Sequence, residues 1–411
     1  MKNKQFNYIL LLFFMLSYTL NSANIFTINV KNDTTEDSFI HKTSDLTNLI
    51  DTLDRDRLSS SFNYLESNQI TANLDLRGLP ISLKFNENSK ILMLDIPSLN
   101  IRESFDGKDR EASVRLLEDW FKNNKKGAEK IMKELARISP IDPIAGNPNS
   151  LMATMVEDDF RNGFQKVASQ QKEIKSKDMI FVAPVFKSLD IEGKQSDNFV
   201  LPLGYTFDVG ENPNEKITLS MPLSYVSVEG AKSYAVGLGV GYTYPLTKDW
   251  ILTPNIKYGM VGSKNLGTLA QIASGALTSS YLIDIGDRYA LSFGNMVGYY
   301  STVKFYDADY AFNPHISNFV FRNAFMFSFP SDKIYKDTSI DLFFINTEYR
   351  GTDLFLESYN EIGLSFGLNK EVMNRTAEED NYEYEDELKL GLSYLTSSKA
   401  NGFEINFGYS F

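Results

Sequence analysis

The sequence predicts a mainly β protein: a 12-stranded antiparallel transmembrane β-barrel that follows a small α+β N-terminal domain and a linking helix. Three observations lead to this fold class. Short alternating segments fill the chain from Met179 onward, the last of them ends the chain as NGFEINFGYSF, and the first 23 residues have the pattern of an export signal. A terminal strand with one apolar, uncharged face would be an aggregation-prone edge in an open sheet, whereas a closed barrel has no edges.

The alternation is clearest in ITLSMPLSYVSV (217–228) and SYAVGLGVGYTY (233–244), where bulky side chains oppose small or polar ones. An apolar face with tyrosines at its ends is typical of a strand that faces lipid. A two-sheet β-sandwich would also alternate and is the alternative. Twelve segments can be read, an even number, as a closed bacterial outer-membrane barrel requires. They lie near 180–189, 198–208, 217–228, 232–244, 250–259, 276–286, 288–300, 317–329, 339–349, 355–368, 386–396 and 402–411.

The first 23 residues have the parts of a secretory signal peptide. Two lysines precede an apolar run from Ile9 to Leu16, and small residues follow up to Ala23. This run is too short to span a membrane and has the flanks of a cleaved signal. We expect the mature chain to begin near Asn24; a buried N-terminal helix is the alternative.

The composition excludes several classes of protein. The chain has 411 residues, a net charge of −12, 30 Phe, 22 Tyr, two His and no Cys. The negative charge disfavours nucleic acid as a partner. Without cysteine there is neither a disulfide framework nor a lipoprotein anchor, and two distant histidines cannot build a metal site. We therefore expect no metal and no cofactor.

The sequence pattern of residues 24–145 predicts a separate α+β domain. A helical pattern covers about 44–67, and three short strands follow in ITANLDL, LPISLKF and KILMLDIP. Two helices come next, with apolar stripes over 114–121 and 131–138. The run SPIDPIAGNPNS (139–150) then breaks the chain, because proline, glycine and asparagine favour turns.

A linker helix is predicted over 146–178, ahead of the barrel at 179–411. Its apolar stripe is long enough to thread a barrel lumen, or it could pack on the two preceding helices. The stripe consists of Met152, Met155, Val156, Phe160 and Phe164.

Charged residues on the polar face of the strands are expected to line the lumen. By parity with their apolar neighbours these are Lys257, Asp284, Arg322, Glu357 and Glu361. Such charges set ion preference in a pore, or they hold a plug by salt bridges. In a barrel this narrow we favour the structural role.

The segments GNPNSLMATMVEDDF, LPLGYTF, LTPNIKYGMVGS, GNMVGYY and ISNFVFRN, with the terminal Phe, give the chain a resemblance to a known family. From about residue 100 to 411 it resembles the translocator barrels of autotransporters, and more narrowly the solitary autotransporter-type outer-membrane barrels. The chain departs from the family in having no long β-helix passenger and no repeat of 20 to 50 residues.

The resemblance implies a non-enzymatic outer-membrane barrel that anchors or exports its small N-terminal domain. A narrow, gated, porin-like channel for small solutes is the alternative. The expected partners are outer-membrane lipid and the barrel-assembly machinery, because the terminal pattern resembles the signal read by that machinery. This pattern consists of Phe403, Ile405, Phe407, Tyr409 and Phe411. The oligomeric state cannot be read from the sequence.

One motif allows an enzymatic hypothesis. In PHISNF, His315 and Ser317 are two residues apart and would share a strand face, as a base and a nucleophile could. Outer-membrane phospholipase A has a similar His-x-Ser-Asn, but Phe319-Val320 replaces the Gly-Arg that follows it there. We find no third member of a triad and expect no catalysis.

Two further features complete the expectations. Asn295 and Asn323 interrupt apolar columns, and a hairpin centred at Asp309 would place them opposite each other, as a self-satisfied pair or a subunit contact. A bulge that turns either residue inward is the alternative. Stretches 260–275 and 301–316 are expected to be long outer loops. The acidic segment 369–385 is expected to be a solvated loop on the opposite side.

Overall fold

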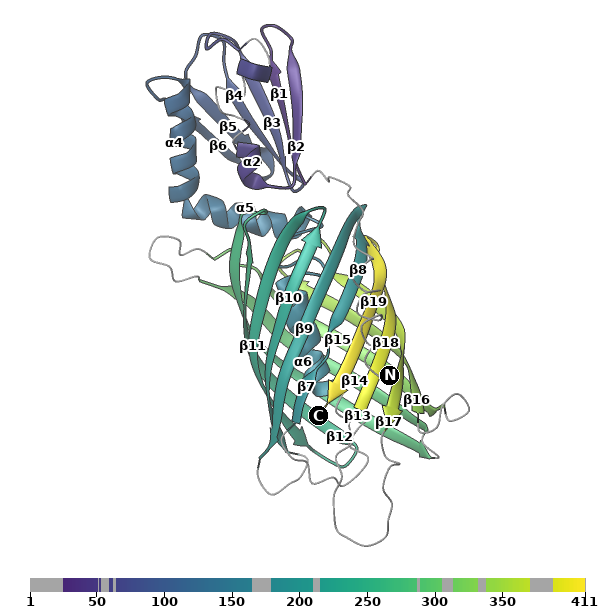
Figure 1. Cartoon of the computed structure of the whole chain (residues 1–411). Helices are drawn as coiled ribbons and strands as arrows, with labels where there is room; N and C mark the ends of the chain where they lie inside the picture. Colours follow the sequence, from purple (N-terminus) through teal and green to yellow (C-terminus); the bar gives the residue numbers. More distant parts are fainter. Residues whose placement is uncertain are drawn as a thin grey trace, which may run out of the picture.

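The computed structural model describes residues 25–50, 52, 59–61, 64–164, 179–209, 215–286, 289–304, 313–331, 338–369 and 387–410. The predicted signal peptide lies outside the described residues. Figure 1 shows a sheet domain at one end of a barrel, with a helix inside the barrel. Among the described helices, none combines the length and the apolar composition needed to cross a membrane.

The N-terminal domain is built on a six-stranded antiparallel sheet in the order β2-β1-β3-β4-β5-β6. β3, β4 and β5 are the three strands that the sequence predicts, whereas β1, β2 and β6 were not predicted. Most of the predicted helix at 44–67 lies outside the described residues, and α2 covers its start. The strands are β1 (Phe26–Asn32), β2 (Ser38–Thr43), β3 (Ile70–Leu76), β4 (Leu79–Phe85), β5 (Leu92–Ile96) and β6 (Ile101–Phe105); α2 is Leu46–Ile50 and a short 3-10 helix, η2, is Pro97–Leu99.

Two helices follow the sheet, α4 (Arg110–Asn123) and α5 (Lys125–Ile138). The Asp109 side chain caps α4 by accepting a hydrogen bond from Ala112 N at 2.7 Å, as a preferred N-cap residue does. α4 packs beside the sheet, and the apolar faces of the two form the core of the domain (Figure 1).

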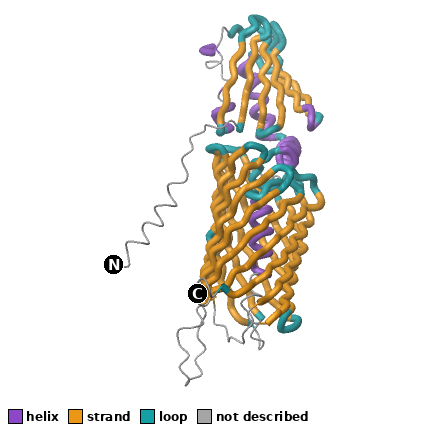
Figure 2. Tube along the Cα trace, turned by 90° about the vertical axis from the view of Figure 1, so that its right-hand side faces the viewer, coloured by secondary structure: helices purple, strands orange, loops and turns teal. Residues whose placement is uncertain are grey.

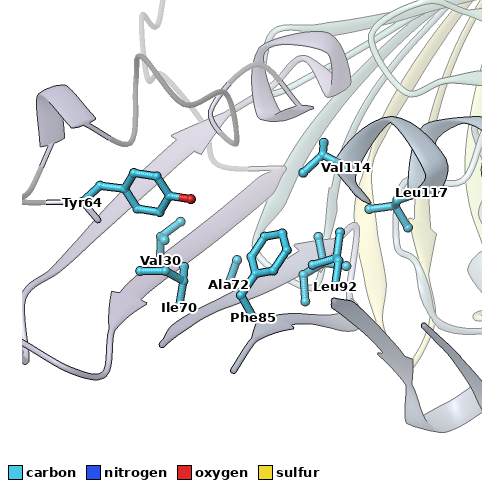
Figure 3. Close-up of a pocket in the computed structure, with 9 residues that line it drawn as sticks. Val30, Tyr64, Ile70, Ala72, Phe85, Leu92, Val114 and Leu117 are labelled. Atoms are coloured by element: carbon cyan, nitrogen blue, oxygen red, sulfur yellow. The ribbon is translucent and has the colours of Figure 1, made fainter. Parts of the chain in front are cut away.

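The core of the N-terminal domain leaves a small gap between the sheet and α4 (Figure 3). The gap has a volume of about 30 Å³, and its lining is almost entirely apolar. A water there would lack the two to four polar partners that buried waters have. The gap is therefore a packing feature and not a ligand site. Its lining residues are Val30, Tyr64, Ile70, Ala72, Leu83, Phe85, Leu92, Val114 and Leu117.

The barrel has 12 antiparallel strands, as predicted. β7 and β8 are two halves of its first strand, because both pair with β9 on one side and with β19 on the other. The last strand thus closes onto the first, which excludes the sandwich. The strands are β7 (Met179–Val182), β8 (Val185–Ile191), β9 (Lys194–Asp208), β10 (Lys216–Val228), β11 (Ala231–Pro245), β12 (Trp250–Ser263), β13 (Thr268–Gly286), β14 (Tyr289–Val303), β15 (Ser317–Pro330), β16 (Thr338–Gly351), β17 (Ser358–Asn369), β18 (Glu387–Thr396) and β19 (Ala400–Ser410).

The barrel strands turn apolar side chains outward and small or polar ones inward. Leu238 on β11 is 59% exposed and Ile256 on β12 is 67% exposed, while Tyr300 on β14 points inward and is fully buried. Figure 2 shows what fills the interior: a helix runs along the barrel axis. An apolar belt around a polar interior is what a wall in contact with lipid requires.

The two ends of the barrel differ. At the domain end, where the N-terminal domain lies, most connections are short turns, such as 192–193 and 229–230. The predicted long loop 260–275 is wrong: β12 and β13 extend through it and leave only the turn 264–267. At the terminal end lie the start of β7 and the end of β19. Apart from Asn369, the predicted acidic loop 369–385 is outside the described residues; it falls between β17 and β18 at this end.

Candidate functional site: the filled lumen and the docked domain

The linker helix α6 (Leu151–Phe164) lies inside the barrel (Figures 1 and 2). It has 14 residues, which corresponds to about 21 Å of length. Its backbone lies nearest to β10, β11, β12, β13 and β14 of the wall. The predicted helix 146–178 begins later than expected, because residues 146–150 form a turn, and residues 165–178 lie outside the described part of the chain.

The apolar stripe of α6 packs on the barrel wall, and only near its start does it also meet α5. Met152, Met155, Val156, Phe160 and Phe164 are all buried in one cluster with wall residues. From α5 the same cluster includes Met132 and Ala136. The structure therefore excludes the alternative in which this stripe packs on the preceding helices and not in the barrel.

Glycines allow the helix to lie close to the wall. A Cβ atom on Gly163 of α6 would lie 2.5 Å from the Thr278 side chain, and one on Gly294 of β14 would lie 2.4 Å from the Phe164 ring. Carbon atoms do not pack at such distances, so a larger residue at either position would force α6 or the contacting side chains to move. At the same depth, Ser280 Oγ donates a hydrogen bond to the Gly163 carbonyl at 3.0 Å.

Three consecutive acids on α6 carry the charges of the site, Glu157, Asp158 and Asp159. All three are buried. Lys257 Nζ of β12 forms ion pairs with both aspartates, at 2.8 Å from Asp159 Oδ1 and closer still to Asp158 Oδ2. The Tyr300 hydroxyl of β14 donates a hydrogen bond to Asp159 Oδ2 at 2.7 Å. These contacts join the helix to two strands at once.

The third acid meets the first strand of the barrel. Lys187 Nζ of β8 lies 2.5 Å from Glu157 Oε2 and 3.5 Å from Glu404 Oε2 of β19. Lys187 therefore links the luminal helix to both strands of the closing seam. Because burial of an unpaired charge is expensive, each member of this set depends on the others.

The third luminal cation has its acidic partner on the barrel wall and not on α6. Arg322 of β15 pairs with Glu361 of β17 at 2.9 Å and also donates to Thr347 Oγ1 of β16. Its guanidinium lies over the Phe160 ring of α6, 5.3 Å from the centroid. Arginine favours such a flat contact with an aromatic ring.

The structure brings together some of the sequence-predicted lumen residues and separates others. Lys257, Arg322 and Glu361 are buried inside the barrel. The other two, Asp284 and Glu357, are exposed at the ends of the barrel. Asp284 is exposed near the terminal end, where its carboxylate accepts a hydrogen bond from Gly286 N. Glu357 is exposed because β17 begins one residue later, at Ser358, so strand parity does not apply to it.

Sequence reasoning missed five luminal residues. Lys187 could have been found by the same parity, since it lies between the outward Phe186 and Ser188 in VFKSLDI. Glu404 follows the same parity, since it lies between the outward Phe403 and Ile405. The acids of α6 gave a clear signal too, because three adjacent carboxylates on an otherwise buried helix require cations nearby. The missed residues are Glu157, Asp158, Asp159, Lys187 and Glu404.

The terminal strand closes the barrel and turns its bulky face outward. Phe403, Ile405 and Phe407 are exposed on the outer surface of β19. The strand pairs with β18 on one side and with β8 and β7 on the other. The side chain of Tyr409 and the whole of Phe411 lie outside the described part of the chain.

The N-terminal domain docks on the rim of the barrel through several backbone contacts. Leu46 N donates to the Asn265 carbonyl in the β12–β13 turn at 3.0 Å, and Phe355 N donates to the Ala136 carbonyl of α5 at 2.9 Å. Leu266 of the rim belongs to the same apolar cluster as the domain core. α5 crosses the barrel mouth between the two parts (Figure 1).

A buried ion pair fixes the turn that leads from the domain into the lumen. Arg77 of the domain lies 3.3 Å from Asp142, and both side chains are buried. Asp142 Oδ1 also accepts from Ile144 N at 2.9 Å. Burial raises the pKa of Asp142 above its usual range, although Arg77 and the two backbone donors of Ile144 and Ala145 lower it in part.

His315 and Ser317 do not form the arrangement expected of a catalytic pair. Ser317 is the first residue of β15, while His315 lies in the preceding loop at φ +54°, so the two do not share a strand face. Nε2 of His315 lies 3.8 Å from a Glu129 carboxylate oxygen of α5. No hydrogen bond joins His315 to Ser317 among the residues that the structure describes. His315 instead lies at the rim where the N-terminal domain docks.

The fold and the lumen define the class: a closed 12-stranded transmembrane β-barrel whose interior is filled by a helix leading from an N-terminal domain. No family model and no curated protein matches the chain.

Solved structures do match the barrel, including the autotransporters that the sequence resembles. The translocator domain of the autotransporter NalP from Neisseria meningitidis is 12% identical, with 63% of this chain and 96% of that chain covered and a TM-score of 0.41. The β-domain of the Bordetella autotransporter BrkA is 10% identical, covering 57% of this chain and 99% of that chain, with a TM-score of 0.39. The KdgM porin is 12% identical, covering 56% and 99%, with a TM-score of 0.33. At these scores the likenesses do not bear on function.

Proposed function

We propose that this protein is an outer-membrane anchor that displays its own N-terminal domain on the outer face of the membrane. The observation that carries the proposal is α6, which enters the lumen from the docked domain and is bound there by Lys187 and Lys257. The chain thus enters the lumen from the domain end, whereas the first strand begins at the terminal end. This is the route that an exported segment tethered to its own barrel would take.

An even number of antiparallel strands brings both ends of the barrel to one side of the membrane, and we place that side in the periplasm. The start of β7 and the end of β19 lie together at the terminal end. The domain end is then the outer end, and the docked domain lies outside the cell. Short turns at the outer end suit this role, because the domain itself covers that rim.

The ion pairs in the lumen support an anchor over an open pore. A conducting pathway would require α6 to leave, and this would separate Lys187 and Lys257 from the three buried acids of the helix. A channel for small solutes is the alternative function, because the wall behind α6 is lined by hydroxyl and amide side chains. Conductance in planar bilayers tests this alternative. The intact protein should show little conductance in planar bilayers. The triple variant Glu157→Gln/Asp158→Asn/Asp159→Asn should show flickering openings as the helix loosens.

The decisive experiment is protease shaving of intact cells that carry epitope tags at three places. One tag follows Asn24, a second replaces part of the connection 305–312 at the domain end, and a third lies in the connection 210–214 at the terminal end. We expect the first two tags to be removed and the third to persist until the outer membrane is permeabilised.

The control tags give each outcome a meaning. Loss of the 305–312 tag shows that the barrel is inserted in the expected orientation. If that tag is lost while the tag after Asn24 survives, the domain is not displayed and the proposal is wrong. Loss of the 210–214 tag in intact cells would reverse the orientation and place the domain in the periplasm.

A further inference from the structure

A row of four asparagines crosses the outer wall of the barrel. Asn295 of β14 pairs in register with Asn323 of β15, as the sequence predicts. The structure extends the row, because Asn323 pairs with Asn346 of β16, and Asn346 pairs with Asn360 of β17. All four lie on outward positions of the strands, so no bulge turns them into the lumen. The row is an unexpected polar feature on a wall that otherwise faces lipid.

The first two asparagines lie deep in the apolar belt. On β14 the outward column runs from Tyr289 to Tyr299, and Asn295 lies between the exposed side chains of Phe293 and Val297. Asn323 has the same setting between Phe321 and Phe325. Tyrosines mark the interfaces of a bilayer, so these two amides lie at the depth of the hydrocarbon.

The row rises toward the outer end, where it meets charged residues. Asn295 is eight residues from the end of β14 at Val303, whereas Asn360 is two residues from the start of β17 at Ser358. Next to the row on β16, Glu348 and Arg350 form an outward ion pair. Glu348 is in register with Phe321, so the charges adjoin the asparagines directly.

The hydrogen bonds within the row are incomplete. Asn346 Nδ2 donates to Asn360 Oδ1 at 2.9 Å. For Asn295 and Asn323, the described part of the chain provides no side-chain hydrogen-bond partner. In hydrocarbon an unpaired amide is costly, and polar side chains there act as contacts between membrane segments.

We propose that the wall formed by β14, β15, β16 and β17 is a dimer interface at which a second copy of this chain binds in the plane of the membrane. An amide is both a donor and an acceptor, so a row of asparagines is complementary to an identical row. A two-fold axis normal to the membrane keeps equal residues of the two copies at equal depth in the bilayer. Asn323 of one copy can then lie against the asparagine row of the other copy.

The far side of the barrel supplies a matched control. On β10 and β11 the outward side chains at the middle of the strands are apolar, among them Leu219, Met221 and Leu238. That wall needs no polar partner. Because the chain has no cysteine, a single introduced cysteine is the only thiol and reports one position.

The test compares Phe321→Cys with Leu238→Cys in outer membranes treated with a short bismaleimide cross-linker. Phe321→Cys retains the complete row, and its product should have the mass of two chains by mass spectrometry. Leu238→Cys should give no such product. Adding Asn295→Leu and Asn323→Leu to Phe321→Cys should lower the yield of the dimer about tenfold, as loss of membrane hydrogen bonds at an interface predicts.

Three results would overturn the proposal: equal cross-linking at both positions, a Phe321→Cys adduct with a different protein, or an unchanged yield in the double leucine variant. Heat-modified mobility in gels must show a folded barrel for each variant. Phe325→Cys, on the other side of Asn323, is the substitute if Phe321→Cys does not fold.

Discussion

The N-terminal domain and the barrel use the same alternation of side chains with opposite results. On β4 of the domain, Leu79, Ile81 and Leu83 are buried in the core. On β11 of the barrel, Leu238 and Val240 occupy the same kind of position in the pattern but point outward and are exposed. A period of two therefore defines two faces, and it does not say which face is the interior.

The composition of the other face decides between the two outcomes. Opposite the apolar residues, β4 carries Ser82 and Lys84, which water can solvate, while β11 carries Gly237, Gly239 and Gly241. A closed barrel has a concave interior with little room, so small residues belong there. The comparison can be tested by substitutions that act on one region and spare the other.

The largest effect is expected inside the barrel from Lys257→Met. This change leaves Asp158 and Asp159 buried without their cation, and loss of one member of a buried ion pair costs about 5 kcal/mol. Urea titration of the barrel, followed by heat-modified mobility on gels, should show the destabilisation.

The matched variants for Lys257→Met separate charge from shape. Lys257→Met/Asp158→Asn/Asp159→Asn should recover most of the stability, because no unpaired charge remains. Lys248→Ala should have almost no effect, since that side chain is 90% exposed beside Asp249. A stable Lys257→Met protein would mean that the ion pairs do not hold α6.

In the domain the corresponding change is Leu94→Ala on β5. Leu94 is 1% exposed, and truncation of a leucine in a packed core costs about 4 kcal/mol through lost burial and the cavity left behind. Limited proteolysis should cleave the domain faster while the barrel keeps its folded mobility. If the barrel unfolds together with the domain, the two regions form one cooperative unit.

The sequence predicted the barrel better than the domain, for physical reasons. Each barrel strand is long enough for its alternation to repeat several times, so all twelve segments could be recognised. In the domain, β6 (IRESF) is five residues long and has charged side chains at its centre, and β2 is an edge strand with partial exposure on both faces. Such short strands depend on pairing with their neighbours, which local sequence does not show.

The site was less predictable than the fold. Strand parity places Lys257 and Arg322 inside the barrel, but it cannot identify partners on another element. Lys257 and Asp158 are 99 residues apart in the chain. Parity also fails where a strand ends, which is why Glu357 was assigned to the lumen although it precedes β17. Only the three-dimensional path of α6 brings the acids to the cations.

A sharper comparison uses two leucines of equal exposure. Leu238 on the barrel is 59% exposed and Leu65 in the domain is 55% exposed. Replacement of Leu238 by lysine should cost about 2 kcal/mol, because the charge must enter lipid, whereas Leu65→Lys faces water and should be nearly neutral. Folding titrations of both variants in lipid vesicles would measure the difference. Equal effects would contradict the assignment of the β11 face to lipid.

The smallest expected effect concerns the start of α4. Asp109 accepts a hydrogen bond from Ala112 N at 2.7 Å, so Asp109→Ala removes an N-cap and should cost about 1 kcal/mol. Asp109→Asn should restore most of this loss, because the amide oxygen can still accept the bond. Hydrogen exchange at the first turn of α4 would report the change, and exchange in the barrel strands should not respond. α4 packs on the sheet, and α5 carries the domain onto the rim of the barrel. If Asp109→Ala also increased hydrogen exchange in β12 and β13, the stability of the rim would depend on the stability of the domain through α5.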